Sequence, residues 1–448
     1  MGRGGRFRPR GGVTSSGNEQ GEAKRPKVVI CGAGFAGLWA ARRLANRPVE
    51  VVLVDRNNYH TFLPLLYQVA AAELAPADIA YPVRSILRSA RNIRFRMEEV
   101  VGVDLAGKRL RVGSGELPYD HLVLAIGSVP DFFGVPGAAT HAFPMRDMQD
   151  ALPLRHRILT RYERASCEVE AERRRALLTF VIVGGGATGV EFTGALAELI
   201  YGPLTRDYPL IAREDVRVIL LEAGSALLPS MPAVLGSYAR ERLLGRGAEV
   251  RTGSMVTGVE AGRILLGETA SIPTETVIWT AGVQGDPQVE AWGIPVGPRG
   301  RAIVGPALHL VERPEVWVAG DLVGAIGGME PLPQVAPIAI QQGEHVAAGI
   351  LHVTAGREPE AFHYRNPGML AVIGRNAAVA ELGGRTFKGW LAWILWLVIH
   401  IAKLIGFRNR ALVLVNWGWN YLRSRRAVRL VLPTSSRAHG VSAGRDGL

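Results

Sequence analysis

Short apolar runs rich in β-branched residues alternate along the chain with segments of helical periodicity. Such runs occupy residues 28–31 and 49–54, and again residues 179–183 and 216–221, with a helical pattern between the members of each pair. Continuous apolar runs are typical of strands buried on both faces of a parallel sheet, and parallel strands are joined by crossover helices. The pattern therefore predicts an α/β fold built around two similar strand-helix-strand units.

The first unit carries a glycine-rich turn between its strand and its helix. The turn comprises Gly32, Gly34, Phe35, Ala36 and Gly37. Glycine permits a tight turn and a close backbone approach to a pyrophosphate, which the positive end of the following helix attracts. The next strand leads to Asp55 and Arg56, about 20 residues further on, where a carboxylate accepts hydrogen bonds from an adenosine ribose. These positions predict a first dinucleotide site.

The second unit repeats this arrangement. Its turn comprises Gly184, Gly186, Thr188 and Gly189, and the following strand ends in Glu222. A carboxylate at this place repels a ribose 2′-phosphate, and Ala223 and Gly224 follow it without an arginine. The sequence therefore predicts a second site that prefers NADH to NADPH. The alternative is that Glu222 only ends a strand.

Two dinucleotide sites in one chain are typical of a flavoprotein that also binds a nicotinamide. We therefore predict FAD in the first of two Rossmann-like dinucleotide-binding domains, NADH in the second, and a helical C-terminal membrane anchor. The expected divisions are a disordered basic tail at 1–24, an FAD-binding domain at 25–146 and 291–360, an NADH-binding domain at 147–290, and a membrane-anchoring region at 361–448.

Further candidate positions follow other apolar strands. The chain has Gly127 after residues 122–126, Gly282 after residues 276–281, and Gly320 and Asp321 after residues 316–319. Small residues there let the backbone approach a ligand, and the Asp321 carboxylate either binds a polyol or lies in a surface turn. Gln341 and Gln342 follow Pro337 in a predicted helix and either bind a polar headgroup or face solvent.

Helical spacing from Asp147 to about Arg175 predicts a connecting helix into the second domain. Four arginines of this segment are expected on its solvent-exposed face, because charged residues usually occupy the polar side of an amphipathic helix. They are Arg155, Arg157, Arg161 and Arg164.

Composition and charge exclude several classes of protein. The 448 residues imply two or three domains, and the basic residues behind the net charge of +12 crowd residues 3–10, 173–175 and 408–429. The arginine-rich and glycine-rich beginning lacks the apolar core of a secretory signal and is expected to be disordered, without a role in binding nucleic acid. Only Cys31 and Cys167 are present. Their wide separation excludes a redox disulfide of the usual spacing and favours a reducing compartment, and we expect no metal site.

An almost entirely apolar segment lies near the C-terminal end. It extends from Gly389 to Phe407 between Lys388 and Arg408, and tryptophans and arginines follow it. The segment is borderline for crossing a bilayer, and His400 and Lys403 would be costly at its centre. We expect it to lie in the membrane interface. A spanning segment, a buried helix pair and a subunit interface are the alternatives.

These motifs together resemble the type II NADH dehydrogenases, single-subunit flavoproteins that transfer electrons from NADH to membrane quinone without pumping protons. The resemblance covers residues 27–431. Besides both glycine turns with their acids, it rests on the apolar loop at 62–70, on 319–321, and on the segment from 374 to 410. The chain departs from the family pattern at Pro337 and Pro367.

The resemblance implies specific roles and partners. Asp55 would bind the FAD ribose, Asp321 the ribityl chain and Glu222 the NADH ribose. Glu191 would lie near the nicotinamide and flavin and assist proton delivery to quinone, the alternative being an acid that only occupies a helix face. Gln341 and Gln342 would border the quinone pocket. The acceptor would be menaquinone or ubiquinone at the cytoplasmic face of the cell inner membrane, as part of a respiratory chain. Monomer and homodimer both stay open.

Other functions remain as alternatives. A flavin-bearing NADH sensor or scaffold would bind partners through its basic ends, with slow turnover at most. A related flavoprotein quinone reductase would use another electron donor. A sulfide:quinone reductase or a disulfide reductase requires paired reactive cysteines, which Cys31 and Cys167 do not resemble.

Overall fold

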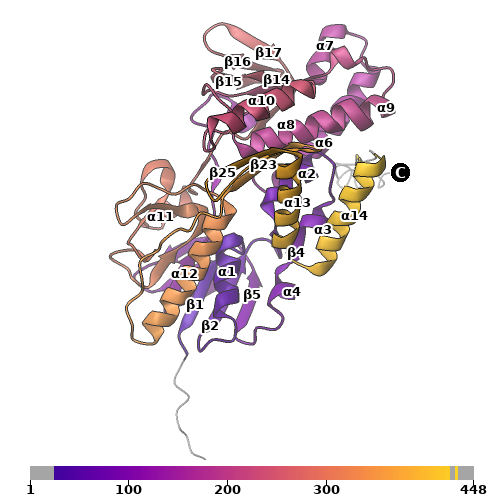
Figure 1. The fold of residues 1–448 in the computed structure, drawn as a ribbon. Coiled ribbons are helices and arrows are strands. Elements are labelled where there is room, and N and C mark those ends of the chain that lie inside the picture. The colour runs from indigo at the N-terminus through magenta and orange to yellow at the C-terminus, as the bar shows by residue number, and fades with distance from the viewer. Residues whose placement is uncertain (1–24, 424–428, 432–448) are drawn as a thin grey trace, which may run out of the picture.

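Two parallel sheets form the centres of two domains, which Figure 1 shows one above the other. The computed structural model describes residues 25–423 and 429–431. The tail expected at 1–24 and most of the basic C-terminal tail lie outside these residues. The first sheet has the order β21-β9-β1-β2-β5. Its strands are β1 (Lys27–Cys31), β2 (Glu50–Asp55), β5 (Ile93–Met97), β9 (His121–Leu124) and β21 (Val316–Val318).

The second sheet repeats the parallel arrangement and is inserted between β9 and β21 of the first. Its order is β11-β18-β12-β13-β14. The strands are β11 (Ala142–Pro144), β12 (Thr179–Val183), β13 (Arg217–Leu221), β14 (Glu249–Arg251) and β18 (Thr276–Trp279). Since β11 pairs with β18, the second domain begins before the expected division at residue 146. The chain crosses between the domains at the antiparallel pair β10 (Val129–Pro130) and β19 (Val283–Gln284).

Helices that follow the glycine turns pack on the sheets. The first domain has α1 (Phe35–Leu44), and α12 (Ala336–Thr354) lies against it although the two are about 300 residues apart. A side chain at Gly343 of α12 would collide with the Ala36 carbonyl of α1, which shows how closely they approach. The second domain has α6 (Met148–Cys167), α7 (Ala171–Leu177), α8 (Ala187–Leu199), the π-helix η2 (Ile200–Leu204), α9 (Thr205–Asp207) and α10 (Ala233–Gly245).

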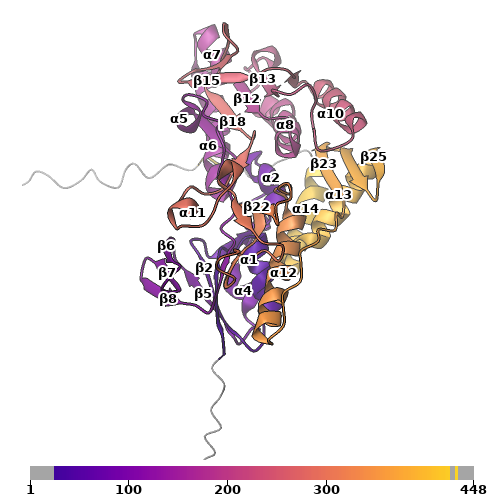
Figure 2. The same cartoon turned by 90° about the vertical axis from the view of Figure 1, so that its left-hand side faces the viewer.

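Small antiparallel sheets complete each domain. Figure 2 shows the one at the side of the first domain. It consists of β6 (Val100–Asp104), β7 (Arg109–Val112) and β8 (Gly115–Pro118). The second domain carries β15 (Val256–Glu260), β16 (Arg263–Leu266) and β17 (Ala270–Pro273). Two other short elements belong to the first domain. Helix α2 (Leu66–Ala70) packs against α6 and α8, and α3 (Pro76–Ile79) contacts the C-terminal helix at 407–423.

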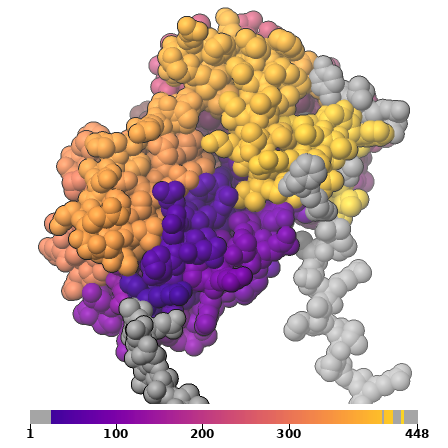
Figure 3. All heavy atoms as spheres, turned by 60° about the horizontal axis from the view of Figure 1, so that its bottom comes forward, coloured from indigo at the N-terminus to yellow at the C-terminus, as the bar shows by residue number. Residues whose placement is uncertain are grey.

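The C-terminal part joins both domains. A three-stranded sheet, β23-β24-β25, packs on α8 and leads to two helices. These elements are β23 (Met369–Gly374), β24 (Ala377–Leu382), β25 (Arg385–Gly389), α13 (Trp390–Lys403) and α14 (Phe407–Arg423). Figure 3 shows the C-terminal residues, in yellow, against the indigo and violet first domain.

The apolar segment at 389–407 is therefore interrupted. Helix α13 has 14 residues, about 21 Å at 1.5 Å per residue, against a hydrocarbon layer of about 30 Å. Among the residues that the structure describes, we find no helix with the length and apolar character needed to cross a membrane.

One continuous core connects the two domains with α13. Phe180 and Ile182 on one face of β12 belong to this core together with Ile30 of β1 and Trp396 of α13. Val181, on the opposite face of β12, belongs to a smaller core under β15 and β16. The alternation follows from the two-residue period of a strand and explains why the run at 179–183 is apolar throughout.

The expectation for the arginines of α6 is wrong at Arg161. Its side chain is only 5% exposed, and its Nε lies 3.0 Å from a carboxylate oxygen of Glu275, as an ion pair rather than an aligned hydrogen bond. Arg157 donates to the Glu275 carbonyl, whereas Arg164 is exposed. Burial of Arg161 follows from the packing of α6 against β18.

Candidate functional site

The three glycines of the first turn have different surroundings. Gly32 has φ of +100°, and a side chain there would collide with the Ala125 carbonyl of the neighbouring strand. A side chain at Gly37 would collide with the Gly32 carbonyl, so this glycine lets α1 pack on the turn. A Cβ at Gly34 would meet nothing within 4 Å. Gly34 thus exposes the N-terminus of α1 to open space, as pyrophosphate binding requires.

The acid after β2 is fixed beside this turn. The two Asp55 carboxylate oxygens accept hydrogen bonds from the backbone N–H groups of Ala33 at 2.6 Å and Asn57 at 2.7 Å. Burial raises the pKa of Asp55, and these two amides oppose the effect. The neighbouring Arg56 points elsewhere and forms an ion pair with Asp147 at 3.1 Å.

The second turn has the same construction. Gly184 has φ of +109° and lies against Ala281, and a side chain at Gly189 would collide with the Gly184 carbonyl. A Cβ at Gly186 would meet nothing within 4 Å. Glu222 accepts hydrogen bonds from the Gly185 and Gly224 amides, both at 2.6 Å.

Both turns therefore fit the pyrophosphate of a dinucleotide. In each, the outer two glycines are needed for packing, and the middle one leaves the helix N-terminus approachable. Asp55 accepts a hydrogen bond from the Ala33 amide in the first turn, and Glu222 accepts one from the Gly185 amide in the second. Each acid keeps lone pairs for a ribose, because a carboxylate accepts about four hydrogen bonds. Thr188 lies exposed in the first turn of α8, whereas Phe35 and Ala36 are buried in the first turn of α1. The open face at Gly34 and Gly186 is the feature that accommodates a bound dinucleotide.

Asp321 lies in a polar cluster beside the first turn. Its carboxylate forms an ion pair with Arg146 at 2.7 Å and accepts a hydrogen bond from Ser128 at 3.1 Å. Gly320 has φ of +83°, and its Cα faces Ala36 at the start of α1. Gly127, with φ of +81°, lies under the Arg146 guanidinium. The structure thus brings 127–128 and 320–321 together at the first turn.

Sequence reasoning missed Arg146. Its partner is 175 residues away, and no local motif marks an arginine before a capped helix as a cofactor-site residue. The only signal was its position next to Asp147, which caps α6 through the Gln149 and Asp150 amides.

Gly282 lies at the crossing between the domains. A side chain there would collide with the ring of Phe133, over which the Arg299 guanidinium is placed at 5.5 Å. The nearby Trp279 indole N–H donates to the Asp131 carbonyl at 2.8 Å. The end of β18, which the sequence predicts to approach a ligand, therefore contacts the residues that follow β10.

A large apolar cavity, here called the helix cavity, opens between the second domain and the C-terminal helices. It has a volume of about 1060 Å³. Its walls come from α2, α8, η2, β23, α13 and α14. The apolar and aromatic residues among its lining are Tyr67, Ala195, Val372, Trp393, Ile394, Trp396, Leu397, Ile401, Leu414 and Trp417, and the polar ones include Gln68, Glu73, Glu191, Glu198, Arg206, Arg213, Arg246, Arg375 and Arg410.

Glu191 contributes a carboxyl group to the wall of the helix cavity. It lies one turn into α8, the helix that begins at the second glycine turn. Its Oε1 accepts the Val372 backbone N–H at 3.1 Å. Burial raises the pKa of Glu191 to about 8, and the Val372 amide and the Trp396 side chain oppose this effect. A carboxyl group with this pKa is largely protonated at neutral pH and can donate a proton.

Neither Gln341 nor Gln342 lines the helix cavity. Gln342 is buried and accepts the Gly320 backbone N–H at 2.8 Å. Gln341 forms two hydrogen bonds with the backbone of Arg365 and borders a separate cavity of about 290 Å³ that also has Arg43 and His345 in its lining. The structure therefore places these two amides in different surroundings.

The cysteines lie in different domains. Cys31 is buried in β1 of the first sheet, and Cys167 is exposed at the end of α6. Burial raises the pKa of the Cys31 thiol. This geometry offers no dithiol for sulfide or disulfide chemistry.

Comparison with known protein families covers almost the whole chain. Residues 26–343 match the pyridine nucleotide-disulphide oxidoreductase family, and residues 367–426 match the NDH2 C-terminal domain. The chain is 39% identical over 418 residues to the type II NADH:quinone oxidoreductase Ndh of Mycobacterium tuberculosis, which covers 90% of this chain and 89% of that protein. The chain belongs to the type II NADH:quinone oxidoreductase family. Its flavin-dependent, NADH-oxidising class and its fold are therefore as expected.

A further relative supports this family, and two solved structures share the fold. The enzyme of that name from Staphylococcus epidermidis is 31% identical over 384 residues, 84% of this chain and 94% of the relative. The structure of NDH2 from Plasmodium falciparum in complex with NADH superposes with a TM-score of 0.83 at 19% identity, covering 90% and 99% of the two chains. The sulfide:quinone oxidoreductase of Aquifex aeolicus shares the fold with a TM-score of 0.70 at 17% identity.

Proposed function

We propose that this type II NADH:quinone oxidoreductase oxidises NADH at its second domain and reduces membrane quinone in the helix cavity, with FAD held by the first domain. FAD supplies the chemistry that accepts a hydride and returns electrons to a quinone. The observation that carries the proposal is Glu191. One helix begins at the dinucleotide turn of the second domain and places this raised-pKa carboxyl group in the wall of a large apolar cavity.

In this proposal the polar residues of the two turns hold the cofactor and the substrate. Asp55 and Glu222 bind the adenosine riboses of FAD and NADH, and Gly34 and Gly186 admit the pyrophosphates. Asp321 binds the ribityl chain, and Arg146 sets the position of its carboxylate through the 2.7 Å ion pair. The Glu222 charge favours NADH over NADPH.

The helix cavity suits a quinone because its wall is mostly aromatic and aliphatic, with a few polar groups. Ligand sites are usually of this kind, and about 1060 Å³ exceeds the space that a single ring needs. Reduction of a quinone to a quinol consumes two protons, and Glu191 can supply one because it is largely protonated at neutral pH. Gln341 and Gln342 lie outside this cavity. We therefore assign Gln342 to positioning Asp321 and leave the quinone headgroup to residues of the cavity wall.

We further propose that α13 and α14 bind a lipid surface without crossing it. Outside the cavity lining, these helices expose Trp390, Leu391, Val415 and Trp419. The same helices line the helix cavity, so a quinone dissolved in the lipid would enter directly from the membrane. His400, which would be costly in lipid, stacks on Trp396 at 4.2 Å instead of facing outward.

Anaerobic stopped-flow spectroscopy tests the function. The purified protein with FAD is reduced by NADH or NADPH, and a short-chain menaquinone or ubiquinone is then added. We expect fast flavin bleaching by NADH, slower bleaching by NADPH and fast reoxidation by quinone. Bleaching without reoxidation by either quinone would refute the proposal and support the NADH-sensor alternative. Reduction by a different donor, with NADH inert, would support another flavoprotein quinone reductase.

A further inference from the structure

Two hydrogen bonds connect the C-terminal helix α14 to the wall of the helix cavity. The Trp417 indole N–H donates to the Gln68 side-chain oxygen at 2.9 Å. The Gln68 amide nitrogen donates to the Tyr67 hydroxyl oxygen, also at 2.9 Å. An indole N–H can only donate, so the Gln68 oxygen must face Trp417 and its NH₂ group must face Tyr67.

This arrangement fixes what the Tyr67 hydroxyl can do. Its oxygen accepts a hydrogen bond from Gln68, which leaves its own proton to be donated. Among the described residues the structure gives this proton no acceptor, and Tyr67 lines the helix cavity together with Glu191. Burial is the main cause that raises the pKa of Tyr67, and the nearby Glu191 carboxyl adds to it. The hydroxyl therefore keeps its proton across the physiological range.

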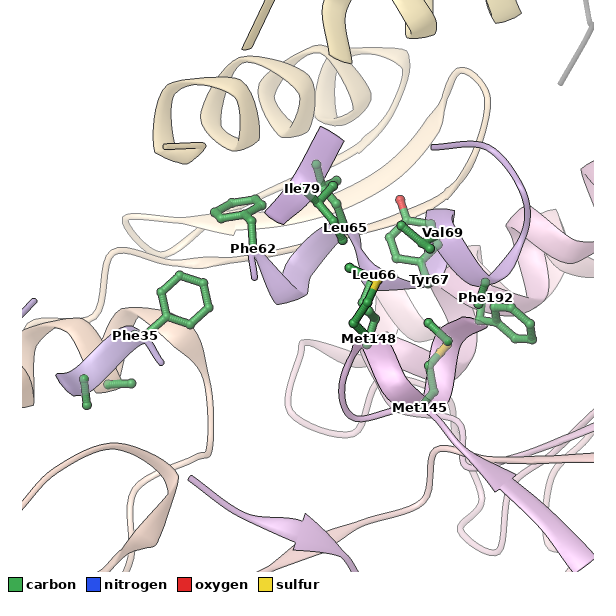
Figure 4. Packing of buried hydrophobic residues seen from close by; sticks show 14 of the residues in the cluster. Phe35, Phe62, Leu65, Leu66, Tyr67, Val69, Ile79, Met145, Met148 and Phe192 are labelled. Carbon is green, nitrogen blue, oxygen red and sulfur yellow. The ribbon is translucent and has the colours of Figure 1, made fainter. Parts of the chain in front are cut away.

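The ring of Tyr67 is held firmly. It is only 4% exposed, and Figure 4 shows it next to Val69 and Leu66, with its hydroxyl pointing away from Met145. Gln68 is equally buried. A buried hydrogen-bonded side chain of this kind has a fixed orientation, since leaving its groups unpaired would be costly.

Helix α14 is itself fixed on the first domain. The Asn409 side-chain amide donates to the carbonyls of Ala77, Asp78 and Ala80 at the end of α3. One further contact, from the Asn416 amide to the Asp78 carboxylate at 3.1 Å, sets the rotation of the helix. The indole of Trp417, the next residue, is thereby directed at Gln68.

We propose that Tyr67 is a catalytic residue that donates a hydrogen bond to a carbonyl oxygen of the quinone, and that Gln68 and Trp417 are positioning residues that aim its hydroxyl. This inference rests on the proposed quinone reduction in the helix cavity. The quinone oxygen gains negative charge as electrons arrive, so a fixed O–H donor stabilises it more during reduction than before. Helix α14 then completes the reaction site in addition to contacting lipid.

Variants of the full-length protein with FAD test this in two separate measurements. In stopped-flow, Tyr67→Phe is expected to slow quinone reoxidation by about tenfold to a hundredfold, and Trp417→Phe by about fivefold to tenfold, with NADH bleaching unchanged in both. Trp292→Phe, at a remote partly buried tryptophan, is the matched control and should keep the wild-type rate. In the oxidised protein, quenching of the tryptophan fluorescence by quinone should give a higher Kd for Tyr67→Phe.

Two substitutions of Gln68 distinguish its role in orienting the Tyr67 hydroxyl from its role in local packing. Gln68→Leu removes both hydrogen bonds. At a pH above the pKa of about 8 that burial gives Glu191 in the same wall, the side chain introduced by Gln68→Glu is ionised. It then still accepts from Trp417, but it also accepts the Tyr67 proton and so turns the hydroxyl away from quinone. The proposal therefore expects Gln68→Glu to slow reoxidation at least as much as Gln68→Leu, although it preserves more of the local packing.

The outcomes are distinguishable. Reoxidation of Tyr67→Phe or Trp417→Phe at the rate of Trp292→Phe would overturn the inference and leave the proposed function intact. Equal losses in NADH bleaching and reoxidation would also overturn it, because that pattern indicates a general structural role. A wild-type protein that quinone does not reoxidise would remove the proposed function and this inference with it.

Discussion

The Gln342 side-chain oxygen accepts a hydrogen bond from the backbone N–H of Gly320 at 2.8 Å. Gly320 has a left-handed backbone and faces Ala36, so the turn that carries Asp321 is fixed between α12 and the first glycine turn. The Gln334 amide adds a hydrogen bond to the Asp321 carbonyl at 3.0 Å. An amide expected at a substrate pocket thus supports the cofactor site instead.

Removing this hydrogen bond should weaken FAD retention. Gln342→Leu keeps the size of the side chain but leaves the buried Gly320 N–H unpaired, which costs about 1–3 kcal/mol. We expect faster FAD release on dilution, followed by flavin fluorescence, and a lower Tm. Gln288→Leu, at an exposed glutamine of the short helix α11 (Gln288–Ala291), is the control. Equal FAD retention in the two variants would contradict the role of Gln342.

Glu191 should make stability depend on pH in an unusual direction. Its folded pKa of about 8 lies above the ordinary value of 4.5, so between these values the folded state binds more protons than the unfolded state. Its contribution is complete below about pH 4.5 and is lost as the pH rises to about 8, with a slope of up to about 1.4 kcal/mol per pH unit. As the pH rises from about 4.5 to about 8, the unfolding free energy of the wild-type protein should therefore fall relative to that of Glu191→Gln. A difference between the two proteins that does not change with pH would argue against the raised pKa.

Glu222 should determine the choice between NADH and NADPH. Glu222→Ala removes the charge that repels a 2′-phosphate and frees the Gly185 and Gly224 amides to donate to it. We expect the preference for NADH, measured as the ratio of the two bimolecular bleaching rates, to fall by about tenfold, which corresponds to about 1.4 kcal/mol. Glu260→Ala, at an exposed acid of the same domain, should not alter the ratio. An unchanged ratio in Glu222→Ala would assign specificity to other residues.

The Arg161–Glu275 ion pair should be important for the stability of the second domain. Glu275→Gln leaves the guanidinium of Arg161 buried without its counter-charge, and breaking a buried pair in this way costs about 3 kcal/mol. The double variant Arg161→Met with Glu275→Gln should recover much of the loss, since the buried charge is gone. Thermal unfolding of the three proteins measures this. A double variant less stable than Glu275→Gln alone would show that Arg161 contributes more than its charge.

The exposed apolar face of α13 and α14 should control lipid binding. Trp390→Asp and Val415→Asp place a charge where the proposed contact excludes water, and each should weaken binding to vesicles of anionic phospholipid by about tenfold. Co-sedimentation measures the bound fraction, and Val353→Asp, at an exposed valine near the end of α12, is the control. Unchanged binding in the first two variants would assign membrane contact to another surface.

The sequence predicts the local parts of this structure well. Both glycine turns, the strands before them and the acids after them depend on short-range patterns, and the structure confirms these elements. The spacing from Gly32 to Asp55 predicts the place of the acid, because the turn, helix and strand between them have nearly fixed lengths.

The parts that could not be predicted depend on contacts between distant segments. The ion pair of Arg146 with Asp321 and the facing of Gln342 toward Gly320 follow from the return of the chain to the first domain. The burial of Arg161 depends on β18, which lies more than 100 residues away in sequence. Helical periodicity shows that a helix has an apolar and a polar face, but it does not show which neighbouring element covers the polar face.

The insertion of one domain within the other determines the order in which they can be completed during synthesis. Every strand of the second sheet lies between Ala142 and Trp279, so that sheet can form as soon as this stretch has left the ribosome. The first sheet waits for β21 and for α12, which come later, although it contains the N-terminal strand. Until β21 is synthesised, the first sheet has only four strands, and its β9 edge is unpaired while the second domain folds. Premature pairing with another chain would therefore begin at this edge.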